Sequence, residues 1–151
     1  MLEKAVRICD ATFGNIYRWD GEALHLVATH DTPPAFAEAR RRSPRRRNDR
    51  NQIVTSILTT KAPVHVVDAA AQPGYIDRSD LGAVQSVELG GVRTFLAVPM
   101  LKDGELIGGF TAVRGHSSNT RMRWRIVSRM RGRCLVVRSK MRRALSRLLP
   151  V

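Results

Sequence analysis

At two places along the chain, apolar segments flank an Asp-Gly pair. In the first place, the turn residues Asp20-Gly21 lie between the run that starts at Phe13 and the run Ala23–His30. In the second, Lys102-Asp103-Gly104 lies between Thr94–Leu101 and Glu105–Val113. Asp-Gly between β-prone segments is a strong hairpin signal, because the tight turn needs φ > 0 and glycine adopts this without steric cost. The sequence therefore predicts two β-hairpins.

Elsewhere, apolar residues recur at the three- and four-residue spacing of an amphipathic helix. Helices are predicted over 2–11, from an N-cap at Thr32 through Arg41, over about 51–60, and from a cap at Ser79 or Asp80 to Gly90-Gly91. Val64–Val67 is predicted as a short strand, whereas 40–50 and 69–77 are predicted as loops. Strands grouped in hairpins and separated by helices favour an α+β fold with an antiparallel sheet.

Length and composition predict one cytoplasmic domain with a single core. The chain has 151 residues, of which 43% are hydrophobic. Its longest run without a polar residue, Phe95–Leu101, is too short to span a bilayer, and the N-terminus has no signal-peptide core. The two cysteines, Cys9 and Cys134, have no CxxC spacing, so we expect buried thiols rather than a disulfide framework.

The formal net charge of +13 is concentrated in two places. Residues 115–151 carry 11 Lys and Arg and no acidic residue, while residues 1–114 are close to neutral. Within the first part, a second cluster lies in the predicted loop and comprises Arg40, Arg41, Arg42, Arg45, Arg46, Arg47 and Arg50. Clustered arginines can hold phosphates. A solvated charged loop, which could also shield a pocket, is the alternative interpretation.

Two long phrases resemble a GAF domain, most closely those attached to bacterial sensor histidine kinases. They are ICDATFGNIYRWDGEALHLVATHDTPPAFAEARRRSP and LGGVRTFLAVPMLKDGELIGGFTAVR. The resemblance covers residues 1–114 and implies an antiparallel sheet of about six strands with helices on both faces. It also implies a ligand pocket between the sheet and the middle helices, pairing through terminal helices, and a role in two-component signal transduction with a kinase partner.

The chain departs from that family after residue 114. An acidic helix leading to an output domain is usual there, whereas residues 115–151 form an arginine-rich segment with a possible amphipathic stripe. Three interpretations stay open: a replacement C-terminal helix, a basic helix that binds nucleic acid or an anionic membrane, and the product of a shifted reading frame. The cyclic-nucleotide residue set and the bilin-attaching cysteine of some members are missing, and no cofactor is identified.

The resemblance places the candidate ligand pocket beside the last hairpin. Its candidate residues are Tyr75, Ile76, Val92, Arg93, Thr94 and Phe95. Arg93 is the most attractive polar anchor, because a guanidinium suits a carboxylate or phosphate. The alternative is that Phe95 belongs to the core and Arg93 to the surface.

The remaining chemistry predicts no enzyme. The four histidines form no zinc-like pair, and there is no nucleophile-elbow, P-loop or dinucleotide-binding glycine motif. The sequence therefore predicts a small-molecule-sensing or regulatory domain without its own output domain. The alternatives are a basic-tailed binder of nucleic acid or anionic membrane and a truncated relic of a sensor kinase.

Overall fold

The computed structural model describes residues 2–47 and 52–115. In these ranges the helices are Leu2–Ile8 (α1), Pro34–Arg42 (α2), Gln52–Thr60 (α3), Pro73–Ile76 (α4) and Leu81–Gly90 (α5), with a 3₁₀ turn at Ala69–Ala71 (η1). The strands are Phe13–Trp19 (β1), Ala23–His30 (β2), Arg45–Arg46 (β3), Val64–Val66 (β4), Thr94–Lys102 (β5) and Glu105–Arg114 (β6). The predicted α+β class is confirmed. The arginine-rich segment 115–151 lies, apart from Gly115, outside the described residues.

The six strands form one antiparallel sheet in the order β3-β2-β1-β6-β5-β4. Both predicted hairpins are present as β1–β2 and β5–β6. In the second, Asp103 and Gly104 have φ values of 52° and 81°, the left-handed pair that a tight two-residue turn requires. The first and last hairpins therefore meet at the centre of the sheet, where β1 pairs with β6.

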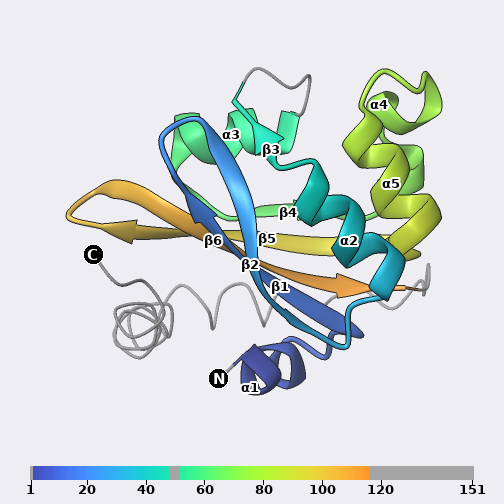
Figure 1. Cartoon of the computed structure of the whole chain (residues 1–151), viewed down its shortest axis with the longest axis horizontal. Helices are drawn as coiled ribbons and strands as arrows, with labels where there is room; N and C mark the ends of the chain where they lie inside the picture. The colour runs from blue at the N-terminus through green and yellow to red at the C-terminus, as the bar shows by residue number, and fades with distance from the viewer. Residues whose placement is uncertain (1, 48–51, 116–151) are drawn as a thin grey trace. The chain divides into compact units, whose positions relative to one another are not determined.

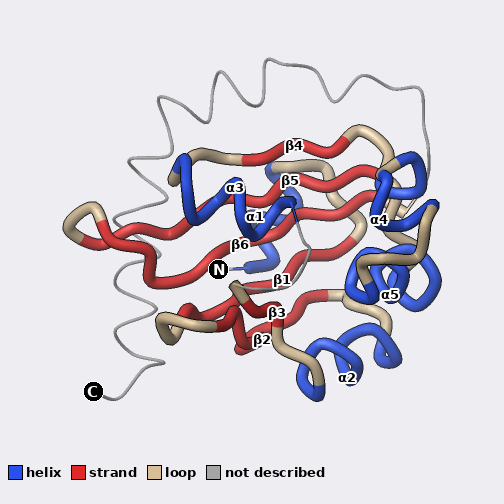
Figure 2. Tube along the Cα trace, turned by 90° about the horizontal axis from the view of Figure 1, so that it is seen from above, coloured by secondary structure: helices blue, strands red, loops and turns tan. Residues whose placement is uncertain are grey.

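Helices cover both faces of this sheet, as Figure 1 shows. Helices α2 to α5 lie on one face, which we call the helical face, and α1 lies on the other. Seen from above in Figure 2, α2, α4 and α5 gather at one end, while α3 crosses the strands nearer the middle. Val6 of α1 packs where a side chain on Gly14 would project, so the glycine lets α1 approach β1 closely.

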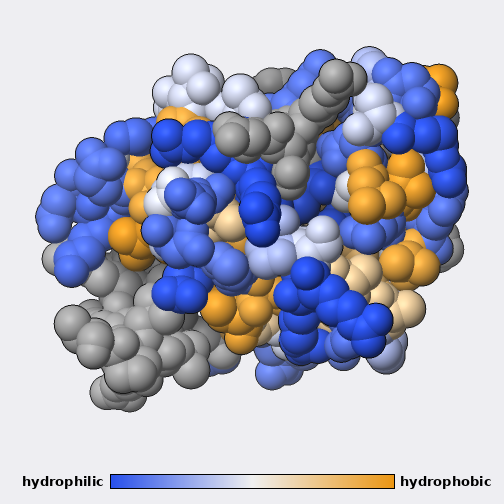
Figure 3. Space-filling model, turned by 45° about the horizontal axis from the view of Figure 1, so that its top comes forward, coloured by the Kyte–Doolittle hydropathy of each residue, from blue (hydrophilic) through white to orange (hydrophobic). Residues whose placement is uncertain are grey.

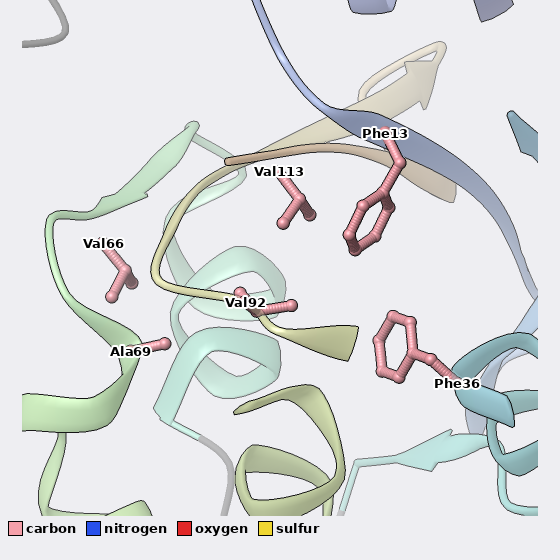
Figure 4. Close-up of a cluster of buried hydrophobic side chains, with 6 residues drawn as sticks. All are labelled: Phe13, Phe36, Val66, Ala69, Val92 and Val113. Atoms are coloured by element: carbon pink, nitrogen blue, oxygen red, sulfur yellow. The ribbon is translucent and has the colours of Figure 1, made fainter. Parts of the chain in front are cut away.

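The core lies on the helical face. Side chains from β1, β6, α2 and the segments beside β4 and β5 converge in one buried cluster (Figure 4): Phe13, Phe36, Val66, Ala69, Val92 and Val113. The rings of Phe13 and Phe36 meet edge to face with centroids 6.0 Å apart. Cys9 is buried, as predicted, whereas Cys134 lies outside the described residues.

Helix ends follow local signals with one exception. Asp80 caps α5 by accepting hydrogen bonds from the Gly82 and Ala83 amides, and Gly91 ends the helix with φ 60°. The predicted cap at Thr32 is wrong, because its hydroxyl donates to Asn15 Oδ1 at 2.7 Å instead, and Pro33 takes the cap position. Prolines in the first turn are confirmed by Pro34.

The loop predicted over 69–77 is also corrected, since it contains η1 and α4. Asp68 caps η1 through the Ala70 amide, and Pro73 begins α4. Figure 3 shows hydrophobic residues gathered on the surface over α4 and α5. Ile76, Leu81 and Leu89 are the large exposed apolar side chains there. Within the described residues, no helix combines the length and apolar character that crossing a bilayer requires.

Candidate functional site

A cavity of about 350 Å³ lies between the helical face of the sheet and the helices α2, α3 and α5. Strands β1, β5 and β6 form its floor. Most of its lining is apolar and includes Phe36, Ile53, Val54, Ile57, Val92, Phe95 and Val113. This size and character are typical of pockets for small organic ligands, which combine apolar walls with a few polar groups that fix orientation.

Arg40 is the most buried of the cations that line the cavity. Its side chain leaves α2 beside Phe36, with the guanidinium carbon 4.8 Å from the ring centroid, and the residue is only 4% exposed. It donates hydrogen bonds to Gly82 O at 2.6 Å, Ser86 Oγ at 2.7 Å and Gln85 Oε1 at 3.1 Å. All three acceptors belong to α5, so Arg40 ties the end of α2 to that helix.

Arg45 and Asp80 form a second link beside it. The two guanidinium nitrogens of Arg45 donate to the two carboxylate oxygens of Asp80 at 3.0 and 3.2 Å. Asp80 also caps α5, so one carboxylate holds both the start of that helix and strand β3. Gly82 makes room for this pair, because a Cβ there would fall 0.9 Å from Arg45 Nη1.

Two guanidinium groups, of Arg40 and Arg45, and two carboxylates, of Asp77 and Asp80, line the cavity. Burial, together with the charge of Arg45, lowers the pKa of Arg40 to about 10, which still leaves the guanidinium charged at neutral pH. Burial raises the pKa of the neighbouring Tyr17 hydroxyl, and the charges of Arg40 and Arg45 oppose that rise. Tyr17 therefore presents a neutral hydroxyl to the cavity at physiological pH.

Thr111 adds a polar group without a partner. Its side chain stands on β6 opposite Asn15 of β1 and Ala97 of β5. The hydroxyl oxygen is buried close to the Tyr17 hydroxyl, but within the described ranges no group meets it with the geometry of a hydrogen bond. A buried hydroxyl without a partner is costly, so a ligand that reached it would gain a hydrogen bond.

The predicted ligand-binding residues divide into those that line the cavity and those that do not. Val92 and Phe95 line the cavity, whereas Tyr75, Ile76, Arg93 and Thr94 lie outside its lining. Arg93 forms a forked pair with Asp68 at 2.9 and 3.0 Å. The Thr94 hydroxyl donates to Val67 O at 2.7 Å.

The arginine cluster is also divided, and its prediction as an exposed loop is wrong for residues 40–42 and 45–46. Residues 40–42 complete α2, and Arg45–Arg46 form β3 against the edge of β2. Acceptors on α5, far away in sequence, make burial of Arg40 and Arg45 possible. Arg41, Arg42, Arg46 and Arg47 lie outside the cavity lining. Among these, Arg42 pairs with Glu38, and Arg47 lies over the Trp19 ring.

Sequence reasoning missed Tyr17, Asp80 and Thr111 as cavity residues. A signal was present for Arg40, which follows Phe36 by one helical turn and so shares its buried face. For Thr111, alternation along β6 places it on the same face as the buried Val113. In the described part of the chain, no group of three His, Cys, Asp or Glu side chains is arranged to hold a metal ion.

Comparison with known families decides what this architecture is. The model of the GAF domain family matches residues 1–128. The chain belongs to the GAF domain family. Domains of this family are generally regulatory or sensory parts of signalling proteins rather than catalysts. The family match extends 14 residues beyond the predicted boundary at residue 114.

Solved structures agree with this GAF fold at low sequence identity. A GAF domain/HD domain protein from Geobacter sulfurreducens has a TM-score of 0.67 at 17% identity, covering 93% of this chain and 92% of that one. A mutated NreA protein from Staphylococcus aureus, altered in its nitrate binding site, has a TM-score of 0.59 at 11% identity, with coverage of 77% and 81%.

A third similar structure is a domain of a kinase. It is a domain of a protein described as a two-component sensor histidine kinase in Sinorhizobium meliloti 1021, with a TM-score of 0.51 at 15% identity and coverage of 89% and 90%. At these identities the likenesses show the shared GAF fold. The comparison with curated proteins gives no match.

Proposed function

We propose that this GAF domain is a sensor that binds a small molecule in the cavity between the sheet and helices α2, α3 and α5. The observation that carries this proposal is the cavity itself, with about 350 Å³ of space, mainly apolar walls and several polar side chains among them. Such a site favours a compact organic ligand. NreA, a protein of the same fold, has a nitrate binding site, which shows that the fold can hold a small ligand.

The proposed signal leaves the cavity through the contacts that join its walls. Arg40 and Arg45 connect α2 and β3 to the start of α5, and both also line the cavity. A ligand that prefers one arrangement of these contacts shifts the population toward it. We propose that a partner in a two-component pathway, such as a histidine kinase, receives this change.

A thermal-shift screen of the whole chain tests ligand binding. The screen uses several hundred small metabolites that include neutral, anionic and cationic compounds, with isothermal calorimetry on each hit. At least one compound is expected to raise Tm in a concentration-dependent way. A screen in which no compound stabilises the protein would reject the sensor proposal.

Two substitutions of alanine by phenylalanine show whether a hit occupies the cavity. Ala97 lines the cavity floor, so Ala97→Phe fills part of the space and should abolish the stabilisation by the hit. Ala35→Phe on the exposed side of α2 is the matched control and should leave it unchanged. Ala83→Leu, on the α5 wall, serves if Ala97→Phe does not fold. Equal binding by the filled and control variants would place the ligand elsewhere.

Pairing of two copies through α1 is a second proposed route for the signal. Ile8 at the end of this helix is 64% exposed, which leaves an apolar side chain for a partner helix. Light scattering on the whole chain should give a dimer mass, and Ile8→Glu should convert it to a monomer. A monomer in the unmodified protein would reject this route.

A further inference from the structure

Arg40 is a buried cation whose hydrogen-bonding partners are all neutral. Its hydrogen bonds go to a backbone carbonyl, a serine hydroxyl and a glutamine amide of α5. The Tyr17 hydroxyl is a fourth neutral group beside it. Within the described ranges, no carboxylate lies within ion-pair distance of Arg40.

The neighbouring ion pair does not provide Arg40 with a carboxylate partner of its own. Arg45 brings a second positive charge to the same end of the cavity, and Asp80 already forms a forked pair with it. Hydrogen bonds that Arg40 donates to neutral acceptors solvate its guanidinium without cancelling the charge. The charge of Asp80 also acts on Arg40, but Asp80 forms its ion pair with Arg45. An anion placed directly beside Arg40 would therefore be stabilised by attraction that water screens only weakly.

The remainder of the cavity selects the rest of the ligand. Away from this end, the walls are formed by aliphatic and aromatic side chains of α3, β5 and β6. Among the polar groups of the lining, the buried Thr111 hydroxyl offers a contact as donor or acceptor. These walls favour a body that loses apolar surface to the protein on binding. A bare inorganic anion would leave them uncovered.

We propose that the cavity recognises a small organic carboxylate with an apolar aromatic or aliphatic body, and that Arg40 holds its carboxylate. A single negative charge matches Arg40, which of the two arginines in the described cavity lining is the one that forms no ion pair, whereas a phosphate brings close to two negative charges at neutral pH. The inference rests on the proposed sensor function, because it names the ligand class for the same cavity.

The chemical class of the hits from the metabolite screen tests this inference. Carboxylates with apolar bodies are expected to dominate the hits. Hits that are mainly neutral or cationic would overturn the carboxylate inference and leave the sensor proposal standing. A screen without any hit rejects the sensor proposal itself, so the two failures are distinguishable. Nitrate or phosphate binding more tightly than every organic carboxylate would also overturn the inference.

Isosteric pairs isolate the contribution of the charge. Benzoate and benzamide, phenylacetate and phenylacetamide, and hexanoate and hexanamide differ mainly in whether the head group is charged. For the pair that matches the best hit, the carboxylate should bind about tenfold or more tightly than the amide, as a charge-assisted hydrogen bond predicts. Equal affinities within the pair would overturn the role assigned to the charge.

Arg40→Met removes the charge and keeps an apolar side chain in place. In this variant the preference for the carboxylate over its amide should disappear. Arg41→Met is the matched control, because its exposed side chain lies outside the cavity lining, and it should retain the preference. A preference unchanged in a folded Arg40→Met protein would overturn the inference.

Two further measurements keep the inference testable if Arg40→Met does not fold. Arg40→Lys preserves the charge and should retain a reduced carboxylate preference. In the unmodified protein, NMR should show the Arg40 Nε–H resonance shift on addition of the preferred carboxylate and stay in place with its amide. An Arg40 resonance that responds equally to both would overturn the assignment.

Discussion

Two arginine–aspartate forks in this domain have the same chemistry and different surroundings. Arg93 and Asp68 join the start of β5 to η1, with side chains that are 36% and 33% exposed. Arg45 and Asp80 join β3 to α5, with side chains that are 13% and 9% exposed. We call Arg93, Asp68 and the neighbouring Thr94 the entry cluster. We call Arg45, Asp80, Arg40 and Thr111 the cavity cluster.

The clusters differ in whether each cation has a carboxylate partner and each hydroxyl has a hydrogen bond. In the entry cluster, Arg93 has its carboxylate and the Thr94 hydroxyl has a backbone carbonyl. In the cavity cluster, Arg40 has neutral partners and the Thr111 hydroxyl has none among the described residues. Satisfied groups hold structure together, whereas unsatisfied groups beside an open volume leave interactions for a ligand.

The largest expected effect comes from Asp80→Ala. This substitution removes the cap of α5 and leaves the Arg45 charge without its partner in a mostly buried site. A loss of about 3–5 kcal/mol in the free energy of unfolding is expected, because breaking a buried pair strands a charge. Urea denaturation followed by circular dichroism measures the loss.

Asp68→Ala is the matched substitution in the entry cluster. It should cost about 1–2 kcal/mol, because an exposed pair contributes little and the η1 cap adds about 1 kcal/mol. Equal losses for Asp68→Ala and Asp80→Ala would show that burial does not separate the two forks.

Gly82→Ala tests the packing of the cavity cluster. Alanine favours a helix over glycine by about 1 kcal/mol, but its Cβ would displace the Arg45 guanidinium. We expect a net loss of up to about 2 kcal/mol, since overpacking costs about 1–3 kcal/mol and the helix propensity of alanine offsets about 1 kcal/mol of it. Gly109→Ala on β6 is the control, because its nearest contact would be an ordinary 3.6 Å from Val98 O. A more stable Gly82→Ala protein would mean that Arg45 moves freely.

A pair of threonine substitutions should change stability in opposite directions. Thr111→Val removes a buried hydroxyl without a partner and should stabilise the unliganded protein by about 1 kcal/mol. Thr94→Val removes a hydroxyl that donates to Val67 O and should destabilise it by about 1 kcal/mol. Thermal unfolding measures both. A loss at Thr111 equal to that at Thr94 would indicate that its hydroxyl is already satisfied.

The smallest expected effect is the pH dependence of the entry cluster. The hydrogen bond from Arg93 holds the pKa of Asp68 below its usual value of 3.8. The folded state therefore binds its proton less readily than the unfolded state. The associated stability is present above pH 3.8 and is lost as pH falls through the folded-state pKa. Asp68→Asn should slightly flatten the acid limb of the stability curve, and an unchanged limb would contradict this assignment.

Local sequence signals were sufficient for the elements whose cause is local. Asp-Gly turns fixed both hairpins, Asp80 and Gly91 fixed the ends of α5, and helical spacing located α3. The sequence does not predict η1 and α4, although Asp68 and Pro73 are helix-start signals, because helices of 3 and 4 residues are too short to show a period. Repulsion between neighbouring arginines predicts an exposed loop. The structure differs because acceptors on α5 and its cap, distant in sequence, pair with Arg40 and Arg45.

The sequence by itself determined the fold class and the order of the hairpins, since turn chemistry and apolar spacing are written in consecutive residues. The family followed from the resemblance of two long phrases to GAF domains, and the family model confirms it over residues 1–128. The tertiary structure alone decided which arginine meets the cavity. Arg93 and Arg40 are both plausible anchors in the sequence, but the sheet turns Arg93 toward Asp68, while the packing of α2 on α5 buries Arg40 beside the cavity. The spacing from Phe36 places Arg40 on the buried face of α2, but the partners of Arg40 lie 42 to 46 positions away in the chain, and no local pattern specifies them.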